Sequence, residues 1–132
     1  MVEDQNFHKV KKIIYVLILL LVFSSKSYSQ NFKLEKLVKL DAPWGSSFIN
    51  DREIIVTEKS GKIKIVNILS KEIKEISHQL NFVVHGQGGL LDIIHKDNYI
   101  WISYTEDRGG YKTSTSIARA EFNKEQLNFK NI

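Results

Sequence analysis

The feature that most constrains this chain is a series of short apolar runs that alternate with polar residues and end at turns. Beyond Gln30, no apolar period of 3.6 residues extends over ten positions. Residues 53–58 and 62–68 instead combine alternation with β-branched residues, and Gly61 lies in the segment between them. Alternation interrupted by glycine-containing turns is typical of antiparallel strands. The fold class predicted for this part of the chain is therefore all-β.

Further strands are predicted on the same grounds. They cover residues 32–40, 46–49, 73–76, 100–106 and 113–122, with the start of one more at 126–129. The segment 32–40 alternates only weakly. Turns are expected at Asn50-Asp51 and at Ser60-Gly61, where glycine and asparagine tolerate the backbone conformations that turns require.

An internal repeat emerges when the chain is compared with itself at an offset of 46 residues. Residues 54–57 then align with residues 100–103, and Trp44 aligns with Leu90 at the opening of each unit. Units of this length with about four strands each match the blades of a β-propeller. On the repeat alone a β-sandwich is an equal alternative, because two weakly similar units of alternating residues occur in both architectures.

The beginning of the chain predicts a secretory signal peptide. Basic residues, Lys12 the last of them, precede an uncharged apolar run over residues 13–23. Ser27 and Ser29 then place small residues at the −3 and −1 positions of a cleavage site before Gln30. The alternative is an uncleaved membrane anchor, although the apolar run is shorter than the roughly 20 residues that a membrane span needs.

These features divide the chain into a signal peptide, residues 1–29, and a β domain, residues 30–132. Cleavage between Ser29 and Gln30 implies a periplasmic or secreted protein without a stable membrane anchor. The chain has no cysteine, which excludes disulfides, thiolate zinc sites and cysteine nucleophiles. The formal net charge of the whole chain is +4. Beyond Gln30 it is only about +2, and the lysines there are scattered, so no nucleic-acid partner is predicted.

The candidate site is the glycine-rich loop that begins at His85. Gly86, Gly88 and Gly89 let the backbone adopt positive φ and approach another surface closely. Gln87 lies between these glycines, and its amide can both donate and accept a hydrogen bond. The alternatives are a loop amide bonded to neighbouring backbone for Gln87 and a solvent-facing turn residue for His85.

Three segments together resemble the N-terminal blade of the soluble PQQ-dependent aldose sugar dehydrogenases, in the glucose/sorbosone dehydrogenase family. They are Pro-Trp-Gly-Ser-Ser-Phe at 43–48, His-Gly-Gln-Gly-Gly-Leu-Leu-Asp at 85–92 and Ile-Trp-Ile-Ser-Tyr at 100–104. The resemblance covers most of residues 37–122. It implies a six-bladed β-propeller, of which this chain would hold about the first blade and most of the second. It also implies a secreted oxidoreductase that transfers a hydride from the anomeric carbon of an aldose to PQQ.

The same resemblance implies PQQ and calcium as cofactors and a sugar as substrate; it does not identify the electron acceptor. His85 and His95 do not match the general base of the family. That base, the cations that hold PQQ and the calcium ligands are expected beyond Ile132. No catalytic or metal-ligating residue is thus expected within this chain, and the chain alone is expected to be inactive. Gln87 matches a glutamine that contacts substrate and cofactor, and His85 is the second candidate. The alternative function is a secreted, non-catalytic propeller that binds a ligand.

Other polar and aromatic residues have structural roles in this interpretation. Trp44 and Trp101 are expected to pack in the core or between blades rather than stack on a ligand. Asp92 is expected to order the loop by accepting backbone N–H groups. His78 and His95 are expected at the surface or at strand ends.

Overall fold

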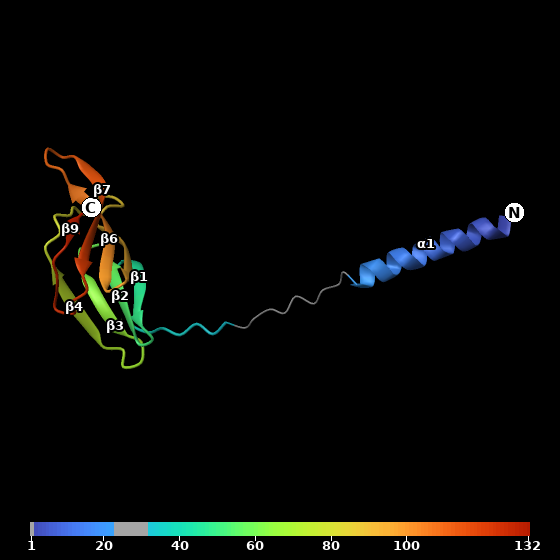
Figure 1. The fold of residues 1–132 in the computed structure, drawn as a ribbon, viewed down its shortest axis with the longest axis horizontal. Coiled ribbons are helices and arrows are strands. Elements are labelled where there is room, and N and C mark those ends of the chain that lie inside the picture. Colours follow the sequence, from blue (N-terminus) through green and yellow to red (C-terminus); the bar gives the residue numbers. More distant parts are fainter. Residues whose placement is uncertain (1, 23–31) are drawn as a thin grey trace. The chain divides into compact units, whose positions relative to one another are not determined.

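A computed structural model of the chain describes residues 2–22 and 32–132. The first of two compact units, Met1–Glu35, contains the helix α1 (Val2–Val22) (Figure 1). Within the described ranges, no helix is both long and apolar enough to cross a membrane. The cleavage site between Ser29 and Gln30 lies outside the described residues, so the signal peptide stays a prediction.

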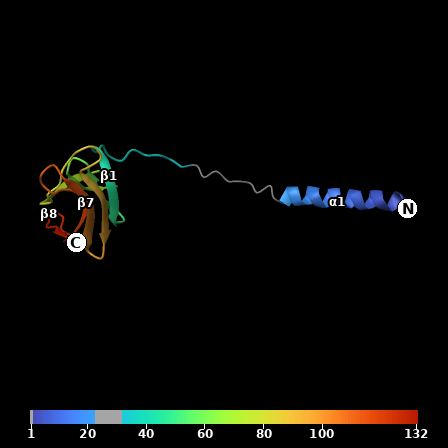
Figure 2. The same ribbon diagram turned by 90° about the horizontal axis from the view of Figure 1, so that it is seen from above.

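The second unit, Lys36–Ile132, consists of strands and turns (Figures 1 and 2). Its strands form two sheets, in the orders β1-β2-β3-β4-β8 and β5-β6-β7-β9. All pairs are antiparallel except β4 with β8, which is parallel. The strands are β1 (Pro43–Asn50), β2 (Glu53–Glu58), β3 (Ile63–Asn67), β4 (Ile73–His78), β5 (Leu90–Lys96), β6 (Tyr99–Asp107), β7 (Thr113–Glu121), β8 (Gln126–Leu127) and β9 (Lys130–Asn131). The all-β class is confirmed, and no helix interrupts residues 43–122.

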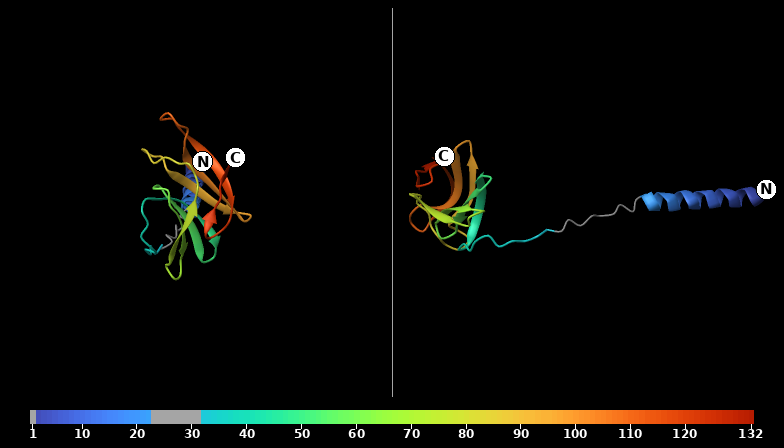
Figure 3. Two further views of the ribbon diagram at one scale, coloured as in Figure 1. Left: turned by 90° about the vertical axis from the view of Figure 1, so that its left-hand side faces the viewer. Right: turned by 90° about the horizontal axis from the view of Figure 1, so that it is seen from below.

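The core lies between the two sheets, whose facing sides are apolar. Each sheet contributes the residues of alternate strand positions, as a pleated strand with one buried face must. The buried core residues are Ile55, Ile63, Ile65, Ile76, Leu90, Ile93, Ile100, Ile102, Tyr104, Ala118, Ala120, Leu127 and Phe129. Each large aliphatic side chain buried here contributes about 1.5–3 kcal/mol to folding. The sheets are therefore held together mainly by aliphatic packing, and Figure 3 shows them from two further sides.

The repeat of 46 residues appears in the structure as two sheets that start alike. The antiparallel pair β1–β2 corresponds to the pair β5–β6, and both pairs have a register irregularity near the start of the first strand. At each irregularity a backbone amide of the first strand donates a hydrogen bond to a side-chain hydroxyl of the second strand. Gly45 N donates to Thr57 Oγ1 (3.0 Å), and Asp92 N donates to Ser103 Oγ (3.1 Å). Thr57 and Ser103 are themselves one repeat length apart, so the two hydroxyls have equivalent tasks.

The first strands of the two sheets, β1 and β5, pack against each other. A side chain at Gly45 would place its Cβ only 2.7 Å from the Cα of Asp92, so this contact requires glycine. Thr57, fully buried, adds a second link by donating to the carbonyl of Leu91 at 2.5 Å. Sheets that meet along their first strands have the arrangement of neighbouring propeller blades.

Two segments differ from the sequence prediction. Residues 32–40 form no strand, because none of the described strands provides the hydrogen-bonded partner that a strand needs. The single strand expected to start at 126–129 is divided: β8 joins the first sheet and β9 joins the second. Both outcomes depend on neighbours that are distant in sequence, which an alternation pattern does not contain.

Trp44 lies outside the core of the described unit, so of the two expected positions, in the core or between blades, the core is excluded. Its side chain is 48% exposed on β1. Trp101 is half-buried on β6, on the side of the second sheet away from the core, with the guanidinium of Arg119 5.3 Å from its ring centroid. These two positions place large aromatic surface on the outside of the described unit.

Candidate functional site

The candidate loop, residues 85–89, leads directly into β5. It is a tight turn closed by a hydrogen bond from Gly88 N to His85 O at 2.7 Å. Gly86 has a φ of +53°, a conformation that glycine adopts at no steric cost. The turn places Gln87 at its tip.

Gly89 shows why the loop needs its glycines. Its φ is +148°, and a Cβ built there would lie 2.2 Å from the carbonyl oxygen of Lys59. The carbonyl of Gly89 accepts a hydrogen bond from Thr105 N at 2.9 Å, which ties the end of the loop to β6. The expected close backbone approach is confirmed, and the surface approached is the turn between β2 and β3.

Gln87 and His85 are both exposed. Neither side chain makes a hydrogen bond within the described part of the chain, so Gln87 is not an amide bonded to neighbouring backbone there. The Gln87 amide therefore retains its full capacity to donate and accept, as a contact to a hydroxylated ligand requires. His85 contributes its carbonyl to the turn, while its ring faces outward.

The other histidines occupy the structural positions expected for them. His78, at the end of β4, makes a hydrogen bond from its Nε2 to the carbonyl of Gly61 at 2.7 Å, and its ring packs near Phe82. The ring of His95 lies edge-on to Phe122 with centroids 5.1 Å apart. In the described ranges, no three His, Asp or Glu side chains gather closely enough to hold a metal ion.

Asp92 accepts a hydrogen bond from the next residue, Ile93 N, at 2.9 Å. This hydrogen bond lies at the irregular start of β5 and not within the turn, so Asp92 orders the start of that strand and not the loop, contrary to the expectation. Its side chain is exposed.

A buried carboxylate, Glu58, is a feature that the sequence analysis missed. Its side chain is fully buried, and Oε1 accepts hydrogen bonds from Lys64 Nζ and Asp41 N, each at 2.7 Å. Burial raises the pKa of Glu58, but the hydrogen bonds from Lys64 and Asp41 outweigh it and hold that pKa below its ordinary value. Its Oε2 is buried and has no partner among the described residues. Glu58 is the last residue of β2 and precedes Lys59, whose carbonyl lies against Gly89 of the candidate loop.

The two packed sheets, meeting along their first strands, are successive blades of a β-propeller. The model of the Glucose / Sorbosone dehydrogenase family matches residues 40–132. The chain belongs to this family, and it comprises part of the propeller.

Two relatives illustrate the match in sequence. The chain is 29% identical over 85 residues to aldose sugar dehydrogenase YliI of Escherichia coli (strain K12), an alignment that covers 60% of the chain and 23% of that protein. It is 31% identical over 101 residues to an uncharacterized protein of Synechocystis sp., covering 67% of the chain and 24% of that protein. The chain thus spans about a quarter of the length of these relatives.

Solved structures agree. The soluble aldose sugar dehydrogenase of Escherichia coli in its apo form superposes with a TM-score of 0.64 at 25% identity, covering 70% of this chain and 29% of that one. The PQQ-bound aldose sugar dehydrogenase of Streptomyces coelicolor superposes with a TM-score of 0.62 at 20% identity, covering 71% and 30%. At that lower identity the second comparison establishes the fold alone.

Proposed function

We propose that this chain is the N-terminal part of a secreted dehydrogenase that oxidises an aldose at its anomeric carbon with PQQ as the hydride acceptor. Family membership and the name of the Escherichia coli relative support it. The observation that carries the proposal is Gln87, whose amide has no hydrogen-bond partner among the described residues and lies at the tip of the glycine loop that resembles the family's.

The chemistry assigns a limited task to these residues. Oxidation breaks the C–H bond of the anomeric carbon and the O–H bond of the hydroxyl group on that carbon, and a lactone results. When bound, PQQ supplies the acceptor for the hydride, and a base takes the hydroxyl proton. Calcium is proposed with PQQ, as the family resemblance implies.

Gln87 is proposed to hold a sugar hydroxyl or a polar group of the cofactor. Its NH₂ donates and its carbonyl accepts, so it can bind a hydroxyl in either direction without a change of charge during turnover. His85 lies two residues earlier in the same turn and is the second candidate for a ligand contact. The loop fits such a contact because both side chains are exposed.

Secretion is the remaining part of the proposal. The basic residues that end at Lys12 and the apolar residues after them, within α1, support a signal peptide. Mass spectrometry of the exported protein is expected to find a chain that starts at or near Gln30. An intact Met1 on protein extracted from membranes would favour the anchor instead.

The test of the function is dye reduction with a panel of aldoses, with and without PQQ and calcium, on the protein purified at its full natural length. Gln87→Ala is expected to lower kcat/KM about tenfold, the effect of losing one hydrogen bond of about 1.4 kcal/mol. Gln126→Ala is the matched control, since that exposed glutamine lies on β8. Ligand binding without any PQQ-dependent dye reduction would favour the non-catalytic propeller.

A further inference from the structure

We propose that Lys59 is a positioning residue that holds the candidate loop, and with it Gln87, from the neighbouring blade. Lys59 is the first residue after β2, in the first sheet, whereas the loop belongs to the second. The consequence for catalysis rests on the function proposed for Gln87. The contact itself rests on geometry alone.

The first contact comes from the ammonium group of Lys59. Its Nζ donates to the carbonyl of Gly86 at 2.5 Å. A charged donor makes this bond stronger than one between neutral groups. The Gly86 carbonyl and the Gln87 nitrogen belong to one planar peptide unit. A hydrogen bond that fixes the carbonyl therefore also fixes the orientation of the Gln87 backbone nitrogen.

The second contact comes from the backbone of Lys59. Gly89 lies so close that an added Cβ would be 2.2 Å from the Lys59 carbonyl oxygen and 3.0 Å from its Cγ. Lys59 thus meets the loop on both sides of Gln87, at Gly86 before it and at Gly89 after it. The one residue therefore restrains both ends of the segment that presents the amide.

Lys59 is itself fixed in place. Its N–H donates to the carbonyl of Ala42 at 3.1 Å. The turn that contains Lys59 is closed by a hydrogen bond from Gly61 N to the carbonyl of Glu58 at 2.9 Å. His78 holds the same turn through the carbonyl of Gly61 at 2.7 Å. Because Lys59 is bonded on several sides, it can act as a fixed support for the loop that it contacts.

The loop needs such a support because three of its five residues are glycine. Glycine loses more conformational freedom on ordering than any other residue, so an unsupported loop would present Gln87 in many orientations. Positioning of a ligand-binding group requires support from residues that do not touch the ligand. Lys59 provides that support here.

The experiment compares Lys59→Met with Lys59→Arg and with Lys62→Met. Methionine retains the apolar stem beside Gly89 but removes the donor, whereas arginine restores a donor. Lys62 belongs to the same turn region, but its ammonium pairs with Glu75 at 3.3 Å, so Lys62→Met is the matched control.

The direct readout is hydrogen exchange of the Gly88 amide, whose bond to His85 O closes the turn. In the protein at its full natural length, Lys59→Met is expected to accelerate this exchange about tenfold. Lys59→Arg and Lys62→Met are expected to leave it near the wild-type rate. Unchanged exchange in Lys59→Met would overturn the inference, whatever happens to activity.

The functional readout is a double-mutant cycle. Lys59→Met is expected to lower kcat/KM several-fold, and to have no further effect when Gln87 is already alanine, because coupled residues are not additive. An equal loss in the presence and absence of Gln87 would contradict positioning. Faster exchange with unchanged kcat/KM would support the hold on the loop and contradict the function proposed for Gln87.

Discussion

Glu58 and the candidate loop show how single residues depend on their surroundings. Glu58 is charged and fully buried, yet it ends an apolar strand. Its position is stable because Lys64 and the amide of Asp41 compensate the cost of burial. The same side chain thereby ties the segment that enters the fold to β2 and β3.

A pH dependence follows from Glu58. Because its pKa in the folded state is held below the ordinary value, its contribution to stability is present above the pKa of the unfolded chain. That contribution is lost as pH falls through the lower, folded-state pKa. Thermal melts of Glu58→Gln between pH 7 and pH 3 are expected to show a smaller loss of Tm on acidification than the wild type. Glu72→Gln, at an exposed glutamate, is the control, and equal slopes for all three proteins would contradict the role of Glu58.

Two glycines of the candidate loop give a second prediction. Gly89→Ala and Gly86→Ala both place a Cβ at positive φ, but only the first also collides with backbone, at Lys59 O. Gly86→Ala is expected to cost about 1–2 kcal/mol, the strain of the left-handed region, and Gly89→Ala more than that. Chemical denaturation measures the difference, and equal costs would show that the approach to Lys59 is looser than described.

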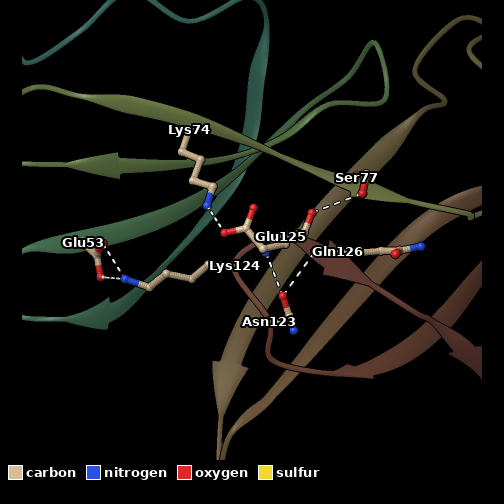
Figure 4. Close-up of polar contacts among 7 residues, drawn as sticks. All are labelled: Glu53, Lys74, Ser77, Asn123, Lys124, Glu125 and Gln126. Atoms are coloured by element: carbon tan, nitrogen blue, oxygen red, sulfur yellow. Dashed lines mark hydrogen bonds and ion pairs between the residues drawn. The ribbon is translucent and has the colours of Figure 1, made fainter.

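At the scale of elements, the segment 123–131 joins the two sheets. It places β8 beside β4 and β9 beside β7, and it inserts Leu127 and Phe129 into the core. The polar side of this segment contacts β4: Glu125 O accepts a hydrogen bond from Ser77 Oγ at 3.1 Å (Figure 4). The same carbonyl also accepts one from Ser77 N at 3.3 Å.

Side-chain contacts add to this attachment. Lys124 Nζ contacts both carboxylate oxygens of Glu53 at 2.7 Å, and Lys74 pairs with Glu125. Asn123 Oδ1 accepts from Glu125 N at 2.7 Å and shapes the turn that starts the segment. The polar contacts are largely exposed, whereas Leu127 is fully buried.

This contrast predicts unequal mutational effects. Leu127→Ala is expected to destabilise the fold by about 2–5 kcal/mol, because it leaves a cavity between the sheets. Lys124→Met is expected to cost about 0–1 kcal/mol, since exposed ion pairs contribute little. Equilibrium denaturation of both variants tests the ranking. A larger cost for Lys124→Met would show that the ion pair, and not the apolar anchor, fastens the segment.

At the scale of the whole molecule, the second sheet has an exposed apolar side. The side of the second sheet away from the core carries Ile94 (52% exposed), Ile117 (53% exposed) and half-buried Trp101. Exposed apolar surface of this kind is uncommon on a monomeric protein and favours association.

The 132-residue chain produced by itself is therefore expected to self-associate in a concentration-dependent manner. Sedimentation velocity over a range of concentrations is the measurement. The paired change Ile94→Lys and Ile117→Lys is expected to reduce association, whereas Val84→Lys, in the loop before the candidate site, serves as a control. A monomer at all concentrations would contradict the expectation.

Sequence reasoning succeeded where the information is local. Alternation and turn residues located β2 and β3 within a residue, because a strand that is buried on one face needs a period of two. The offset of 46 residues found the shared start of the two blades. The glycine loop was recognised because close backbone approach demands residues without Cβ.

What the sequence by itself determined is the class of the fold, the family and the position of the loop that carries Gln87. Only the tertiary structure decided that Glu58 is buried, that residues 126–131 divide between two sheets and that Lys59 meets Gly86. The physical reason is that strand pattern and turn chemistry depend on neighbours along the chain. Burial of a charge and a contact between Lys59 and Gly86 depend on how two sheets pack, and no local pattern encodes that packing.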